Sequence, residues 1–305
     1  MRNSVVNKLE HLAKNDPDIM FLVGDLGFGV IESFQKKFSK QFINVGVAEQ
    51  NLTGVATGLG MLGKKAITYS IGNFNTLRCL EQIRNDALYH NINLTIISVG
   101  GGFSYGQLGY SHHATEDYGI LRTLPKITIF TPGSREEAIV SLEESIKING
   151  VSYIRIDKSH FFEEDHKLGL PIDTSPRELI TGDETVIVGV GGVIAEGFKA
   201  AEHFKKRNKK IGIISLPRVK PMDTTCLVQL LKKYKNIITI EEHNLINGIS
   251  TIIKEICFDN QINLDHFFNL GIEDSFSSVV GDQKFLRKEN NIDSNSIIKC
   301  IELIS

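Results

Sequence analysis

The amino-acid sequence predicts an α/β protein built on parallel β-sheets. Apolar runs of strand length recur from end to end of the 305 residues, and helix-length segments separate them. These runs are apolar on both faces, which is typical of strands that helices cover on both sides of a sheet. The composition agrees with a globular fold, because 41% of the residues are hydrophobic and 23% are charged.

Nine apolar runs are expected to form strands, in chain order. They cover residues 19–25, 42–47, 65–71, 94–100, 127–132, 151–157, 185–191, 210–216 and 236–242. Helices are expected at 48–60, 80–90 and 134–148, and a last strand and helix at 267–272 and 294–304.

A polar stretch with Pro and Gly residues interrupts this alternation between Asp157 and Thr185 and suits a linker. The length of the chain also favours two domains. We therefore predict a first domain at 1–165, a linker at 166–180 and a smaller second α/β domain at 181–305.

Charge and cysteine usage exclude several classes of protein. The net charge is −2, and the longest basic cluster, at 205–210, falls where a helix should end, so no nucleic-acid partner is expected. No stretch approaches the roughly 18 apolar residues of a membrane span, so we expect no membrane partner and a cytoplasmic location. The four cysteines are scattered without a CxxC pair, which favours neither a disulfide framework nor a zinc site.

The glycine loops do not predict nucleotide binding. Residues 189–197, GVGGVIAEG, follow a strand but hold only the first two glycines of a dinucleotide fingerprint, and no acidic residue ends the next strand. We interpret this loop as a tight turn between strand and helix. No GxxxxGK[ST] loop occurs, so the sequence favours neither a dehydrogenase nor an NTPase.

Glu49 stands out because it follows the strand at 42–47 and opens a helix with glycines at 54, 58 and 60. Ligand sites in parallel sheets lie beyond the carboxyl ends of strands, where this carboxylate is expected. A glutamate in the first helical turn is also favoured by the helix dipole alone. Position by itself therefore leaves both a functional and a structural role open.

The segment NVGVAEQNLTGVATGLGMLG, with the segments downstream of it, resembles the pyrimidine-binding domain of the transketolase family, and the resemblance extends over nearly the whole chain. It implies thiamine diphosphate as the cofactor. Glu49 matches the glutamate that binds N1′ of the aminopyrimidine, and a desolvated carboxyl group there shares a proton with that nitrogen. Phe74 matches a ring that stacks on the pyrimidine, and Asp25 an acidic position near the cofactor.

Further matches imply substrate contacts. His112, in the segment GYSHHATED, matches the substrate-facing histidine of the family, and Arg155 matches an arginine that holds the substrate phosphate. Gln107 replaces the acid of the usual GEDG loop, and Leu108 replaces an aspartate that binds a donor hydroxyl. Without the family, Phe74 is equally an ordinary core residue and Arg155 equally a surface residue.

The family's GDG motif, which holds a divalent cation on the diphosphate, does not occur in this sequence. The resemblance then implies that this chain is the C-terminal subunit of a split enzyme. We expect an N-terminal subunit to supply the diphosphate-binding domain and the ligands of Mg²⁺, in an α2β2 assembly. The isolated chain should show neither tight cofactor binding nor turnover.

The resemblance predicts a transferase that moves a two-carbon ketol unit from a ketose-type donor to an aldose acceptor. Leu108 cannot accept a hydrogen bond, so a deoxy or otherwise modified sugar is the expected donor. Two alternatives stay open within the same cofactor class: an enzyme like deoxyxylulose-phosphate synthase, and a beta-type subunit of a 2-oxoacid dehydrogenase. A non-catalytic assembly or regulatory subunit is the alternative from another class.

Overall fold

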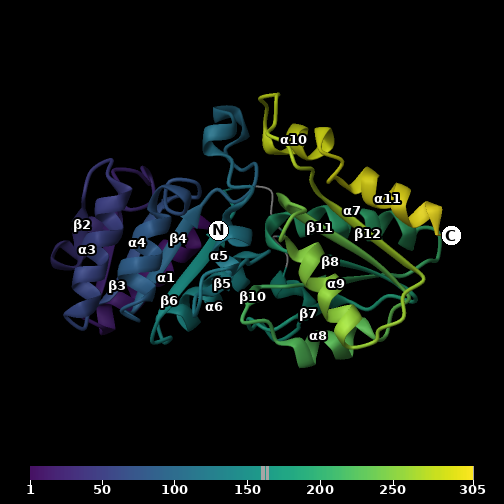
Figure 1. The fold of residues 1–305 in the computed structure, drawn as a ribbon, viewed down its shortest axis with the longest axis horizontal. Helices are drawn as coiled ribbons and strands as arrows, with labels where there is room; N and C mark the ends of the chain where they lie inside the picture. Colours follow the sequence, from purple (N-terminus) through teal and green to yellow (C-terminus); the bar gives the residue numbers. More distant parts are fainter. Residues whose placement is uncertain (159–161, 163–164, 305) are drawn as a thin grey trace.

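The computed structural model describes residues 1–158, 162 and 165–304, and it contains two sheets that lie side by side (Figure 1). The first sheet has the order β10-β5-β6-β4-β3-β1-β2, and the second has the order β12-β11-β8-β9-β7. Among the described strands, only β10 in the first sheet and β7 in the second pair antiparallel to their neighbours. The α/β fold class is confirmed.

The strands have the following bounds: β1 Ile19–Val23, β2 Phe42–Asn44, β3 Lys65–Ile71, β4 Leu94–Val99, β5 Thr128–Phe130, β6 Val151–Ile156, β7 Arg177–Ile180, β8 Thr185–Gly189, β9 Ile211–Ser215, β10 Arg218–Lys220, β11 Asn236–Asn244 and β12 His266–Ile272. Each of the ten runs expected to form a strand contains one, since the central strands are buried on both faces and their apolar runs are unbroken.

The helices have the following bounds: α1 Arg2–Asn15, α2 Glu32–Lys37, α3 Glu49–Met61, α4 Leu80–Gln82, α5 Asp117–Arg122, α6 Arg135–Ser145, α7 Ile194–Lys205, α8 Thr224–Leu231, α9 Ile249–Asp259, α10 Gln283–Glu289 and α11 Ser294–Leu303. Short 3-10 turns include η4 (Gly106–Leu108) and η5 (Tyr110–His112). The helix expected at 80–90 begins as α4 and continues as the π-helix η3, Ile83–Leu88.

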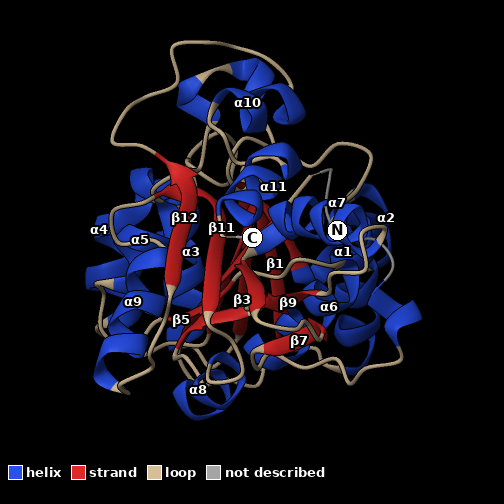
Figure 2. Ribbon diagram, turned by 90° about the vertical axis from the view of Figure 1, so that its right-hand side faces the viewer, coloured by secondary structure: helices blue, strands red, loops and turns tan. Residues whose placement is uncertain are grey.

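Neighbouring residues of the central strands face opposite sides of the first sheet. Phe21 and Ile97 pack in a cluster with α1 and α6, whereas Leu22 and Ile96 pack in a cluster with α3. This period of two explains why helices must cover both faces, and Figure 2 shows the strands between layers of helices.

The second domain repeats this arrangement with α7 and α11 on one face of its sheet and α8 and α9 on the other. β10 leaves this domain's part of the chain and pairs with β5 of the first sheet, which ties the two domains together. The predicted linker at 166–180 includes β7, Arg177–Ile180, which joins the second sheet. We retain the predicted domain bounds as a proposal.

No helix within the described residues is long and apolar enough to cross a membrane. A cytoplasmic location stays a prediction from the sequence.

Candidate active site

A buried carboxylate lies beyond the carboxyl ends of β1, β2 and β3. Glu49 opens α3, shortly after β2 ends, and is only 1% exposed. Its Oε1 accepts a hydrogen bond from Ser70 Oγ (3.2 Å), and its Oε2 is ion-paired with Arg78 Nη1 (2.6 Å). The backbone of Gly24 lies against the carboxylate, because a Cβ built there would be only 3.5 Å from Oε1.

Two rings extend this group away from Glu49. The guanidinium carbon of Arg78 lies 4.3 Å from the ring centroid of Phe74, and the His112 ring meets Phe74 edge to face at 5.0 Å between centroids. His112 Nδ1 lies 3.0 Å from Ser111 Oγ, and partial burial lowers the pKa of His112. The structure thus brings together three predicted site residues from separate parts of the chain.

Sequence reasoning missed Arg78, although it connects the other members of the group. Its side chain is 43% exposed and spans from the carboxylate of Glu49 to the face of Phe74. One signal was present, since Arg78 follows Phe74 by four residues, a spacing that brings side chains together within a helical turn. The partner Glu49, 29 residues earlier, could not be read from that spacing.

Asp25 lies at the same edge of the sheet but does not contact this group within the described residues. It is exposed, with a left-handed backbone at φ 55°, immediately after Gly24. Its amide donates to Asn44 Oδ1 (3.1 Å), and its Oδ1 accepts from Asn44 Nδ2 (3.0 Å). This pair joins the ends of β1 and β2 next to Glu49, so a cofactor contact by Asp25 stays a prediction.

The structure does not bring Gln107 or Arg155 to the Glu49 group. Gln107 is exposed on η4 and lines a separate pocket of about 280 Å³ with Lys158 and Asp282.

Arg155 is 2% exposed and lies at the contact between the domains. Its Nε donates to Asp117 Oδ2 (2.9 Å), and its Nη2 donates to the carbonyl oxygens of Ala114 and Glu242 (2.8 Å each). The guanidinium is thus committed to protein acceptors, so we do not carry the phosphate-binding role of Arg155 into the proposed site.

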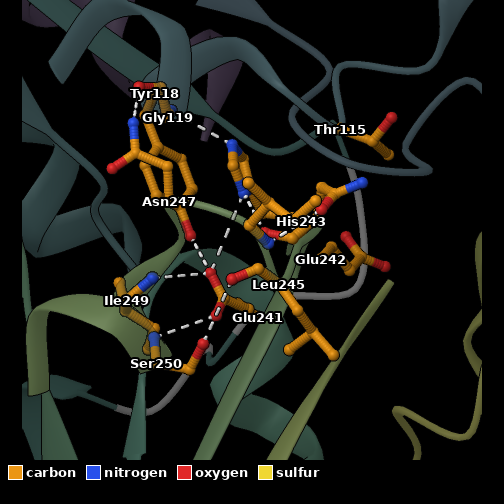
Figure 3. Close-up of polar contacts among 12 residues, drawn as sticks. Thr115, Tyr118, Gly119, Glu241, Glu242, His243, Leu245, Asn247, Ile249 and Ser250 are labelled. Carbon is orange, nitrogen blue, oxygen red and sulfur yellow. Dashed lines mark hydrogen bonds and ion pairs between the residues drawn. The ribbon is translucent and has the colours of Figure 1, made fainter. Parts of the chain in front are cut away.

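The same contact contains a second buried polar group, built around Glu241 (Figure 3). Its carboxylate accepts hydrogen bonds from the Tyr118 hydroxyl, from Ile249 N (2.8 Å) and from Ser250 N (3.1 Å). Burial raises the pKa of Glu241 to about 7, against these bonds, which favour the charged form. The acid therefore links α5 of the first domain to the start of α9 in the second.

His243 completes this contact. Its ring stacks on Tyr118 with centroids 3.8 Å apart, and its Nε2 accepts from Gly119 N (3.1 Å). Nδ1–H then donates to the carbonyl of Asn244 (2.7 Å), which requires the neutral ring, and burial lowers the pKa of His243 to about 4. The EEHN segment, residues 241–244, is thus devoted to holding the domains together.

A pocket of about 230 Å³ borders the predicted site and has walls from both domains. Asn73 and Leu77 line it from the turn that carries Phe74, Ser111 lines it from η5, and Phe276 lines it from the second domain. Asn73 Nδ2 donates to Ser111 O (3.1 Å), while its buried Oδ1 has no hydrogen-bond partner among the described residues. The pocket therefore offers a polar acceptor to a small molecule next to His112.

The side chains present fit the aminopyrimidine of thiamine diphosphate. Glu49 supplies a buried acceptor, Phe74 supplies a flat apolar face, and a planar cation with N–H donors, the guanidinium of Arg78, already bridges the two. A diphosphate with its cation needs hard oxygen ligands. Within the part of the chain that the structure describes, no group of three or more His, Cys, Asp or Glu side chains could hold a metal ion.

Family models match both domains. Residues 1–162 match the transketolase pyrimidine-binding domain, and residues 177–266 match the transketolase C-terminal domain. The chain belongs to the transketolase family. Family membership implies thiamine diphosphate as the cofactor, in agreement with the side chains around Glu49.

Full-length relatives of this transketolase chain are subunits of split enzymes. One of the two subunits of the apulose-4-phosphate transketolase of Actinobacillus succinogenes is 30% identical over 302 residues, which cover 98% of this chain and 96% of that protein. A solved structure described as split gene transketolase, inactive beta4 tetramer, has a TM-score of 0.86 at 26% identity and covers 99% of this chain and 96% of its own. In length and domain content, the chain corresponds to the C-terminal subunit of a split transketolase.

Single-chain enzymes of the family are also similar. The 1-deoxy-D-xylulose-5-phosphate synthase of Aquifex aeolicus is 27% identical over 302 residues, which cover 96% of this chain but only 46% of that protein. The chain therefore spans about half of such a synthase.

Proposed function

We propose that this chain is the C-terminal subunit of a thiamine diphosphate-dependent transketolase that moves a two-carbon ketol unit from a ketose-type donor to an aldose acceptor. The observation that carries the proposal is the buried Glu49, which lies at the carboxyl edge of a transketolase pyrimidine-binding domain with Phe74 close by. When bound, thiamine diphosphate supplies the nucleophilic carbon that takes up the ketol unit.

Each residue of the group has a role in this proposal. Glu49 binds ring nitrogen N1′ and holds a proton there, which a carboxyl group shielded from water can do. Phe74 stacks on the pyrimidine. His112, whose pKa burial lowers, is neutral near pH 7 and exchanges a proton with a substrate hydroxyl. Asp25, exposed at the neighbouring strand end, is assigned to the rim of the cofactor site.

We further propose that activity requires an N-terminal subunit, in an α2β2 assembly. That subunit would supply the diphosphate-binding domain and the ligands of Mg²⁺. Two observations support this: the described residues contain no metal-binding group, and the similar solved structure is described as an inactive tetramer of beta chains.

The test is reconstitution of the chain with the N-terminal subunit that co-purifies with it. We expect turnover and one thiamine diphosphate per pair of chains only when both subunits and Mg²⁺ are present. Substantial turnover by the isolated chain would rule out the split-subunit proposal.

Glu49→Gln in the reconstituted enzyme separates a catalytic role from an assembly role. Turnover should fall by at least about 100-fold, the lower range for lost acid–base catalysis, while the size of the assembly stays unchanged. Glu81→Gln, at an exposed glutamate of α4, is the matched control and should keep full activity. Full activity of Glu49→Gln would instead favour a non-catalytic assembly or regulatory subunit.

We propose a deoxy or otherwise modified sugar as the donor. Leu108 is 55% exposed on η4, the turn that precedes the one bearing His112, and offers no hydrogen-bond acceptor to a sugar hydroxyl. The relative from Actinobacillus succinogenes is named for apulose 4-phosphate, which agrees with use of an unusual sugar. Comparison of kcat/KM for donors with and without the corresponding hydroxyl tests this, and an equal preference would contradict it.

The similarity to 1-deoxy-D-xylulose-5-phosphate synthase favours a second candidate, a condensation that starts from pyruvate. The two reactions differ in a product, because pyruvate must lose CO₂ and a ketose donor does not. Release of CO₂ from labelled pyruvate by the reconstituted enzyme, with no turnover of ketose donors, would select the second candidate.

A further inference from the structure

Arg78 already occupies the part of the site that an aminopyrimidine needs. Its Nη1 lies 2.6 Å from Glu49 Oε2, and its guanidinium carbon lies 4.3 Å from the centroid of Phe74. A guanidinium is planar, stacks on aromatic faces and presents N–H donors in its own plane. A flat heterocycle that stacks on Phe74 and donates a ring N–H to Glu49 would need the same acceptor and the same face.

Both carboxylate oxygens of Glu49 are occupied, but their two partners differ in freedom to move. Ser70, which donates to Oε1, is 0% exposed within β3. Arg78 reaches Oε2 from the surface, and its side chain is 43% exposed. Of these two partners, only Arg78 can leave for solvent without opening the core, so Oε2 is the oxygen that becomes available to a ligand.

We propose that Arg78 is an internal stand-in for the cofactor: it pairs with Glu49 and covers Phe74 while the site is empty, and it must swing out for the aminopyrimidine to bind. This inference rests on the proposed function. In the empty subunit, the ion pair spares Glu49 an unpaired buried charge, which is costly. Arg78 is therefore a positioning residue that competes with the cofactor.

The direction of the effect separates this role from a merely structural one. If Arg78 competes with the cofactor, its removal should strengthen cofactor binding, whereas the loss of an ordinary structural contact should weaken it or leave it unchanged. An ion pair with an exposed partner usually contributes no more than about 1 kcal/mol, which corresponds to roughly fivefold in affinity.

The experiment is calorimetric titration of the reconstituted two-chain complex with thiamine diphosphate at fixed Mg²⁺. Arg78→Met removes the charge and the N–H donors but keeps an unbranched stem, and it should bind roughly fivefold more tightly than the wild type. Arg84→Met is the matched control, because Arg84 is exposed in the same segment and donates to its neighbour Asn85. The control should match the wild type.

Far-UV circular dichroism and the size of the complex show whether Arg78→Met folds and assembles. If it does not, Arg78→Lys provides the comparison, because an ammonium keeps the charge but cannot stack as a flat plane. It should bind the cofactor more tightly than the wild type, by less than about fivefold. Equal or weaker binding by a folded variant overturns this inference alone, whereas a wild-type complex that binds no cofactor overturns the proposed function as well.

Discussion

The substitution Arg155→Met tests whether this arginine holds the two domains together or binds a substrate. The guanidinium is 2% exposed and donates three hydrogen bonds, to Asp117 Oδ2 and to two backbone carbonyls, one of which belongs to β11 of the second domain. Methionine would leave Asp117, 0% exposed in its side chain, with Tyr153 as its remaining side-chain donor among the described residues.

The expected cost follows from this burial. Removal of one partner from a buried ion pair typically lowers the free energy of unfolding by about 3–5 kcal/mol, because the other charge stays buried without compensation. An exposed arginine usually contributes less than about 0.5 kcal/mol. Arg155→Met should therefore be far more destabilising than Arg84→Met, the exposed control.

The assay is denaturant unfolding of the full chain, followed by circular dichroism. The double variant with Asp117→Asn should recover part of the loss, because it also removes the uncompensated charge. A loss below about 1 kcal/mol in Arg155→Met, together with a large rise in KM for a phosphorylated donor, would refute the domain-contact role. That result would restore Arg155 to the substrate site.

The remaining predictions concern α3 and the domain contact. Gly54→Ala should raise the free energy of unfolding of the isolated chain by roughly 0.5–1 kcal/mol, since nothing lies within 4 Å of the added Cβ. Gly60→Ala should lower it, because its Cβ would lie 2.9 Å from Ile92, and equal effects in thermal melts would contradict both. In Glu241→Gln, the wild-type-minus-variant difference in unfolding free energy should fall between about pH 4.5 and 7, because the raised pKa of Glu241 makes its stabilising contribution disappear as pH rises. A difference that stays constant across this range would show that the acid does not titrate there.

The class of fold and the position of the central acid follow from the sequence alone. Strands buried on both faces require unbroken apolar runs, so each run of that kind contains a strand. Glu49 could be placed beyond a strand end because the turn from a strand into a helix is a local feature, readable from a few neighbouring residues. Phe74 and His112 were found through motif resemblance, and the structure brings their rings together.

The partners that these side chains meet depend instead on how the chain packs in three dimensions. Arg78 reaches Glu49 across 29 positions, and Arg155 turns inward to a carbonyl 87 positions away in the second domain. β10, which follows β9 of the second sheet, pairs instead with β5 of the first sheet. Hydrophobic periodicity specifies which face of an element is buried, but it does not specify which distant residue lies across that face. The physical reason is that a charge or a hydrogen-bond donor is satisfied by any acceptor the fold brings near, and packing of the two domains makes that choice.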